Sequence, residues 1–354
     1  MLNTRQWAAI LALTVGLTAC GSAAPASSGA SASGEATNID QLYAAAKREG
    51  TVTVYAPTPT EIMSQMVSAF NQKYPGIKAN ATDLTAGQTV ERIVTESASG
   101  KVSIDASQAS LGTIQPLVER QLLAKVDWPK FTDGASGDLM TLDGQALVYY
   151  HLPNVMAYNT QLLKESDVPH QWEDLLKPQF KGGKMLIDAR GNFAGFLGVI
   201  WDQDRLTKYA TDIKAQQPLF IPRMVDGINR LAAGEAAVAT VSMNNYVIFA
   251  AKKAPVGLTP ISPVNASIFT IYALKNAPHP NAARLWVAWA ASKEGRALFE
   301  KTGNYALATP GSGSNMEKLL SDAHLTIWAA KNFDEVAQED KYQKMVQDIF
   351  GAVK

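Results

Sequence analysis

Short strands and amphipathic helices alternate through residues 39–121, and this alternation constrains the fold more than any other feature. Residues 51–55 read Thr-Val-Thr-Val-Tyr, and an alternation of polar and apolar side chains is typical of a strand. The elements predicted here are a helix at 39–49, the strand at 51–55, a helix opening at Thr60, a strand at 77–82, a helix at 88–99, a strand at 102–107 and a helix at 111–121. Strands joined by helices through short turns form a largely parallel sheet covered on both faces, which predicts an α/β fold.

The rest of the chain continues this mixture of strands and helices. The predicted elements are an extended stretch at 146–159, a short helix at 170–178, a strand at 184–188, an apolar helix beginning near Phe193, a helix at 222–233, a strand at 236–241, a helix at 244–253, a strand at 267–274, helices at 281–291 and 293–302, and a helical tail from 315. Trp286 and Trp289 stand at helical spacing among alanines, so we expect them in the core. A body of this length is too long for one lobe.

The N-terminus carries an apolar run at about residues 7–17, preceded by one basic residue, Arg5. The run is shorter than the roughly 20 residues of a membrane span and is typical of a secretory signal. It ends in Leu17-Thr18-Ala19-Cys20, which resembles a bacterial lipobox. The resemblance implies a signal peptide at 1–19, acylation of Cys20 (palmitate in a lipoprotein) and an extracytoplasmic protein anchored to the cell membrane, periplasmic or at the cell surface.

Residues 20–37 join this cysteine to the folded body. After Cys20 they are nearly all Gly, Ala, Ser and Pro, a composition that cannot bury enough apolar surface to offset chain entropy. We therefore expect a disordered tether. Cys20 is also the sole cysteine, so its acylation leaves no thiol for a disulfide, a catalytic thiolate or a metal.

Composition and motifs exclude several classes of function. Lys and Arg together number 32, as do Asp and Glu, and a net charge of zero argues against a nucleic-acid partner. No nucleophile elbow, P-loop, His-Glu-x-x-His or Gly-x-Gly-x-x-Gly motif is present, so we expect no enzyme, no catalytic residue and no cofactor. The four histidines (151, 170, 279 and 324) lack metal-ligand spacing, and we expect no metal site.

Five motifs in register resemble type II periplasmic solute-binding proteins of ABC importers, closest to the ferric-ion, thiamine and phosphonate branch. They are Glu49-Gly50 leading to Tyr55; Val155-Met156-Ala157-Tyr158-Asn159-Thr160; Trp172-Glu173-Asp174-Leu175 with Pro178 and Phe180-Lys181-Gly182; Gly234-Glu235; and Ala277-Pro278-His279-Pro280-Asn281 with Ser292-Lys293-Glu294-Gly295. The match runs from about 38 to 310.

The resemblance implies two α/β lobes joined by hinge strands, with the ligand in the cleft between them. The crossings are expected at about 149–160, with Tyr158 and Asn159 as hinge residues, and near 267–272. Lobe one would comprise 38–150 plus 270–312, and lobe two 151–269. The lobe of the C-terminal helices, 313–354, stays open.

In lobe two, the strand-to-helix turn at 188–192 suits an anion. Free N–H groups at a helix start stabilise an oxyanion, and the resemblance implies an anion at this turn. The arginine of this turn would add a bidentate fork; a surface pair with Asp188 or Asp202 is the alternative. Amide donors at the start of the helix predicted at 244–253 could help, although the first could be a simple N-cap. The candidate residues are Arg190, Gly191, Asn192, Asn244, Asn245 and Tyr246.

In lobe one, the candidates lie at predicted strand ends. Thr58 and Thr60 follow the first strand, and Ser107 and Gln108 end the third. Hydroxyl and amide groups suit neutral polar parts of a ligand; ordinary turn and capping chemistry is the alternative.

Ferric members of the branch use a histidine, a carboxylate and two adjacent tyrosines. The matching positions here hold Pro59, Ser110, Tyr246 and Val247, so one ligand of four is kept. Ferric binding therefore remains an alternative rather than the main prediction.

The sequence predicts a monomeric, lipid-anchored receptor that captures a small anionic or zwitterionic organic solute and delivers it to the permease subunits of an ABC importer. The alternatives are a ferric-ion receptor and a ligand-sensing lipoprotein that docks on a signalling partner.

Overall fold

The computed structural model describes residues 35–351, and those from Ala36 onward belong to one unit. The predicted signal peptide and Cys20 lie outside the described residues. No described helix has both the length and the apolar character that a membrane crossing requires.

Lobe one is built on three parallel strands, with β1 (Thr51–Ala56) between β2 (Lys78–Asp83) and β3 (Ala106–Ser110). The third strand lies later in the chain than the predicted 102–107. Ser103 is held in a loop because its backbone N–H and hydroxyl donate to the carboxylate of Glu96, at 2.7 and 2.8 Å. The strand begins at Ala106, after this loop, and ends at Ser110 rather than at 107.

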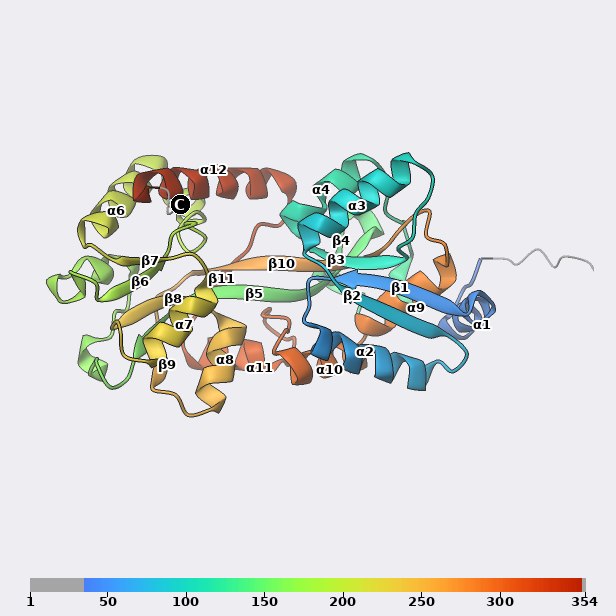
Figure 1. Ribbon diagram of the computed structural model, residues 1–354, viewed down its shortest axis with the longest axis horizontal. Helices are drawn as coiled ribbons and strands as arrows, with labels where there is room; N and C mark the ends of the chain where they lie inside the picture. Colours follow the sequence, from blue (N-terminus) through green and yellow to red (C-terminus); the bar gives the residue numbers. More distant parts are fainter. Residues whose placement is uncertain (1–34, 352–354) are drawn as a thin grey trace, which may run out of the picture. The chain divides into compact units, whose positions relative to one another are not determined.

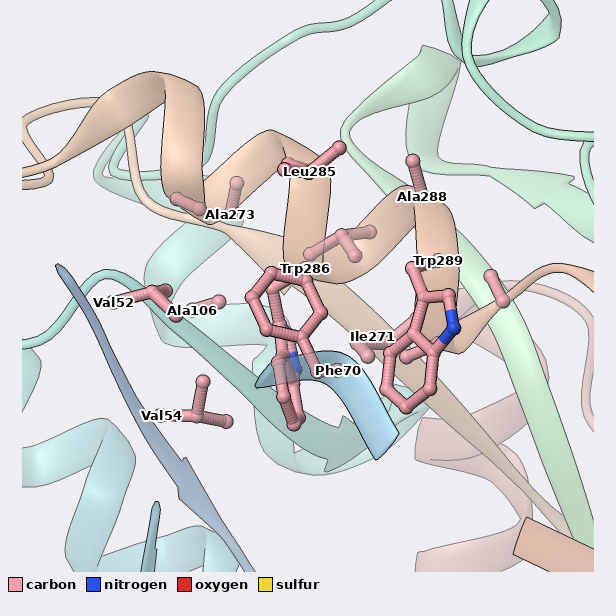
Figure 2. Packing of buried hydrophobic residues seen from close by; sticks show 14 of the residues in the cluster. Val52, Val54, Phe70, Ala106, Ile271, Ala273, Leu285, Trp286, Ala288 and Trp289 are labelled. Atoms are coloured by element: carbon pink, nitrogen blue, oxygen red, sulfur yellow. The ribbon is translucent and has the colours of Figure 1, made fainter. Parts of the chain in front are cut away.

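Helices cover both faces of this sheet (Figure 1). One layer holds α1 (Ile39–Glu49), α2 (Thr60–Lys73), α9 (Pro280–Ala290) and α10 (Lys293–Gly303), and the other holds α3 (Ala86–Ala98) and α4 (Leu111–Glu119). In Figure 2, Phe70 of α2 packs beside Trp286 and Trp289 of α9. The ring centroids are 5.1 and 5.5 Å from that of Phe70, which confirms the predicted core role of both tryptophans.

Lobe two holds β6 (Met185–Asp188), β7 (Leu219–Ile221), β8 (Val238–Ser242) and β9 (Val256–Leu258), with helices α6 (Gln203–Ala215), α7 (Met224–Ala232) and α8 (Met243–Ala251). The sequence did not predict α6, β7 or β9. A 3₁₀ helix at Trp172–Leu176 replaces the predicted helix at 170–178.

The predicted apolar helix beginning near Phe193 is wrong. Residues 191–196 form successive turns, with the N–H groups of Ala194 and Gly195 both donating to the carbonyl of Gly191. A regular helix, α5 (Leu197–Ile200), is only four residues long. The positive φ of 74° at Gly191 bends the chain away from a helical path.

Two long antiparallel strands pass between the lobes. β5 (Ala146–Asn159) and β10 (Val264–Ala273) pair along most of their length, with Tyr150 opposite Phe269 and Asn154 opposite Asn265. The second half of β5 also pairs with β8 and β9, and the second half of β10 pairs with β3. A short strand, β4 (Met140–Thr141), pairs with the start of β5. The strands of residues 35–351 thus belong to one sheet. The lobe boundaries at 150 and 270 stay predictions.

The C-terminal tail contacts both lobes. Helix α11 (Asn315–Asp322) packs in the lobe-two core, and β11 (Ile327–Trp328) runs parallel to β10. Helix α12 (Phe333–Phe350) lies across the lobes, against α5 and α6 on one side and α4 on the other (Figure 1).

Candidate functional site

A cavity of about 720 Å³ lies between the lobes. Its floor is formed by β5 and β10, its lobe-one side by the start of α4, and its lobe-two side by the loop ends after β6, β7 and β8. Helix α12 forms a further wall. Segments far apart in the sequence therefore meet around one space, as in sheets whose ligands bind beyond the strand ends.

The cavity floor is partly aromatic and partly polar. Asn154 and Asn265 are paired across the two strands, and Phe269 lies further along β10. The Phe269 ring is stacked on that of Tyr150, with centroids 4.5 Å apart and planes within 10°. The strands thus offer both amide groups and a firmly packed ring to a ligand.

Three helices of nine residues each begin at the cavity. Ser110 caps α4 by accepting a hydrogen bond from the N–H of Thr113, and Arg223 and Ser242 hold the cap positions of α7 and α8. The first N–H groups of a helix lack partners within it and carry partial positive charge. The cavity therefore has a weakly positive lining from both lobes.

Arg190 lines the cavity but is paired with Asp188. Its Nε donates to Oδ1 of Asp188 at 2.9 Å and its Nη2 to Oδ2 at 3.2 Å. The Asp188 side chain is fully buried, whereas that of Arg190 is 46% exposed. The pairing that the sequence left as an alternative is thus present, and it neutralises a carboxylate that could not otherwise be buried cheaply.

Arg223 has a similar partner on its own helix. Its Nη2 donates to Oδ1 of Asp226 at 3.0 Å and its Nε to Oδ2 at 3.2 Å. Both cavity arginines are consequently matched by an aspartate within three residues in the chain.

Helix α12 brings carboxylates to the same cavity. Glu339 accepts a hydrogen bond of 2.5 Å from Nδ2 of Asn265, which also donates to the carbonyl of Asn192 at 3.0 Å. Burial raises the pKa of Glu339 to about 7 and raises that of Asp340 as well. Gln343 donates to the side chain of Asn192. These contacts fix α12 against the 188–192 turn.

The structure brings two of the six lobe-two candidates, Arg190 and Asn192, to the cavity. Gly191 lies behind it, where a Cβ would be 3.1 Å from the carbonyl oxygen of Gln343. Asn245 donates to Ser242 at 2.8 Å, and Asn244 lies beside Tyr305. Tyr246 packs in the lobe-two core. These three side chains do not line the cavity.

The lobe-one candidates lie elsewhere. Ser107 and Gln108 are buried inside β3: the Ser107 hydroxyl donates to the carbonyl of Tyr55 at 2.7 Å, and Gln108 accepts from Thr58 at 3.4 Å. Thr60 lines a separate 400 Å³ pocket beside Asp83. Because β3 ends at Ser110, that residue occupies the cavity edge instead.

The two hinge candidates lie at the lobe-two end of β5. Tyr158 pairs with Val238 and Gly257, and the side chain of Asn159 donates to the carbonyl of Leu231 at 2.7 Å. The part of β5 at the cavity is instead Leu152 and Asn154.

Sequence reasoning missed Arg223, Ser242, Asn265 and Glu339. A helix-start arginine and a serine before a predicted helix were readable signals. No local pattern marks Asn265 or Glu339, because long-range packing brings them together.

A model of the bacterial extracellular solute-binding protein family matches residues 109–327. The chain belongs to this family. The matched region includes β5, β10 and the cavity loops after β6, β7 and β8. The protein is thus a solute-binding protein of the extracytoplasmic type, and the family resemblance seen in the sequence is confirmed.

Solved structures share the two-lobe α/β fold. Iron-bound HitA from Pseudomonas aeruginosa superposes with a TM-score of 0.69 at 18% identity, over 85% of this chain and 99% of that one. AfuA from Actinobacillus pleuropneumoniae with fructose-6-phosphate has a TM-score of 0.61 at 19% identity, over 84% and 97%. An uncharacterized protein of Haemophilus influenzae is 21% identical over 73% of this chain and 78% of its own. The fold prediction is confirmed.

Proposed function

We propose that this solute-binding protein is the lipid-anchored receptor of an ABC import system and captures a small anionic or zwitterionic organic solute. The 720 Å³ cavity carries the proposal, because both lobes and the strands joining them line it. A solute there would touch Ser110 of one lobe and Arg190 of the other.

Closure of the lobes is the expected mechanism. A ligand that contacts both lobes favours the conformation in which all its contacts form, and it shifts the open–closed equilibrium by its difference in affinity for the two states. Bending of β5 and β10 where they cross between lobes would permit this motion without unfolding either lobe. The permease would then recognise the closed form.

The membrane anchor is proposed from the sequence. Acylated Cys20 followed by a Gly, Ala and Ser-rich tether would hold the monomeric receptor near the permease. Mass spectrometry of the membrane-extracted protein should find diacylglycerol on Cys20, and Cys20→Ala should release the protein from membranes.

Ferric ion is the second candidate, since two of the structural neighbours were solved with iron bound. Fe(III) prefers anionic oxygen ligands, whereas Pro59, Ser110 and Tyr246 offer at most one phenol. Among the described residues, no group of three or more His, Cys, Asp or Glu could hold a metal. A coloured one-to-one adduct with ferric citrate would reinstate this candidate.

The direct test is a stability screen of the purified protein against organic acids, sugar phosphates, phosphonates, amino acids, thiamine compounds and metals. A ligand at a hundred times its dissociation constant adds about 2.7 kcal/mol to the free energy of unfolding. Small-angle scattering should then show a smaller radius of gyration with a positive compound. A screen in which only metals stabilise the protein would contradict the proposal.

A further inference from the structure

Among the described residues, the positive side chains around the cavity have ion-pair partners, whereas the negative ones do not. Arg190 and Arg223 each have an aspartate partner that lies outside the lining. Across the part of the chain that the structure describes, neither Glu339 nor Asp340 forms an ion pair. The unpaired side-chain charge at the cavity is therefore negative, and it lies apart from the partial positive charge of the helix starts.

The side-chain oxygen of Asn265, on the cavity floor, also favours a ligand that donates a hydrogen bond. Asn265 is 4% exposed and lines the cavity. Its two donated hydrogen bonds, to Glu339 and to the carbonyl of Asn192, fix which amide atom is the oxygen. That oxygen is buried and has no hydrogen-bond partner within residues 35–351. A buried acceptor without a donor is unfavourable, so a ligand that donates a hydrogen bond here would be favoured.

The carboxylates lie on a wall that is firmly held. Helix α12 packs so closely on lobe two that a Cβ at Gly195 would be 2.8 Å from Cβ of Gln343. On the lobe-one side, a Cβ at Gly112 of α4 would be 2.9 Å from Val336 of α12. The position of Glu339 is thus set by contacts with both lobes.

We propose that α12 is the specificity wall of the cavity, where Glu339 and Asp340 bind a protonated amine of the solute. The oxyanion of the same solute would lie at the starts of α4 and α7. This inference rests on the proposed function and narrows it: the solute is a zwitterion that carries an amine, rather than a simple anion.

The experiment uses matched probes that differ in the amine. The pairs are glucosamine 6-phosphate with glucose 6-phosphate, O-phosphoethanolamine with 2-hydroxyethyl phosphate, and γ-aminobutyrate with butyrate. Calorimetric titration of the wild-type protein should show, in at least one pair, binding of the amine member about tenfold or more tighter, as expected for a charge-assisted hydrogen bond.

Variants on α12 then test which residues give this preference. Glu339→Gln should reduce the ratio of the two affinities about tenfold, because it weakens binding of the amine member without weakening that of the amine-free anion, and Asp340→Asn should act in the same direction. Asp348→Asn is the control, because this residue of the same helix is exposed, pairs with Lys344 and does not line the cavity. It should leave both affinities unchanged.

The outcomes separate the two proposals. Equal or tighter binding of the amine-free members would overturn the role of α12 while the solute receptor stands. A preference that survives both Glu339→Gln and Asp340→Asn would overturn it too. If no member of any pair binds, the inference is wrong, and the proposed solute receptor is then decided by the wider stability screen.

Discussion

The 188–192 turn and helix α12 line the same cavity but treat charge differently. In the turn, Arg190 is matched by Asp188, whose side chain is fully buried. On α12, Glu339 accepts a hydrogen bond from the amide of Asn265 and has no cation partner within residues 35–351, and burial raises its pKa to about 7. The charges of the turn neutralise one another without a ligand, whereas the carboxylate of Glu339 has no such partner within the described residues. Unmatched groups are thus a better guide to a ligand than conspicuous charged ones.

This difference has a structural cause. Asp188 ends a buried strand, where an unpaired carboxylate would be costly, so the fold itself requires Arg190. Glu339 lies on a helix that borders open space, and a ligand can neutralise it. The following predictions test this contrast between the turn and the helix.

The largest effect is expected for Arg190→Ala. The substitution leaves Asp188 buried without its cation and should lower the free energy of unfolding by about 3 kcal/mol or more. Urea unfolding at pH 7 measures it. The double variant Arg190→Ala with Asp188→Asn should recover part of the loss. A loss below about 1 kcal/mol would show that Asp188 does not depend on the arginine.

Glu339→Gln should change how stability depends on pH. The pKa of Glu339 is raised from 4.5 to about 7 in the folded protein. Between these values the unfolded chain loses its proton first, so the Glu339 contribution to stability falls as pH rises and then stays low above about 7. The full deficit is about 3 kcal/mol.

Urea midpoints at pH 5 and pH 8 measure this deficit. The glutamine variant should gain stability over wild type mainly at pH 8. An equal difference in stability between the two proteins at pH 5 and at pH 8 would contradict this prediction. After burial, the Asn265 hydrogen bond lowers the pKa of Glu339 and the charge of Asp340 raises it, so the comparison measures the Glu339 titration with both interactions included.

Gly198→Ala tests how firmly α12 is seated. A Cβ at this position would lie 2.4 Å from Cγ of Tyr342, so α12 must shift, and we expect a loss of about 1–3 kcal/mol. Amide hydrogen exchange should also speed up in α12. Gly87→Ala in α3 is the control, because no atom lies within 4 Å of its added Cβ. It should leave stability unchanged or raise it by about 0.5 kcal/mol.

The smallest effect is expected for Arg223→Ala. The side chains of Arg223 and Asp226 are 70% and 28% exposed, so water replaces the lost pair and the stability change should stay within about 1 kcal/mol. A loss as large as that of Arg190→Ala would remove the distinction between buried and exposed pairs drawn above.

Local pattern was enough to predict much of the fold. The alternation at 51–55, the long extended stretch at 146–159 and the tryptophans among alanines reflect side-chain periodicity, which short segments carry by themselves. The motifs in register also placed the chain in its family. Shorter elements were predicted less well. A loop held by Glu96 precedes β3, which therefore begins later than predicted, and turns at 191–196 stand where a helix was predicted.

The candidate site likewise combines residues that local sequence predicts with residues that only tertiary packing brings together. The sequence by itself marked the 188–192 turn, because a turn and its arginine are local features. Only the tertiary structure decided that Asp188 already neutralises this arginine, that Ser107 and Gln108 are inside a strand, and that α12 completes the cavity. Electrostatic balance depends on which side chains meet in space, and Asn265 and Glu339 meet across 74 positions of chain through packing that no local pattern encodes.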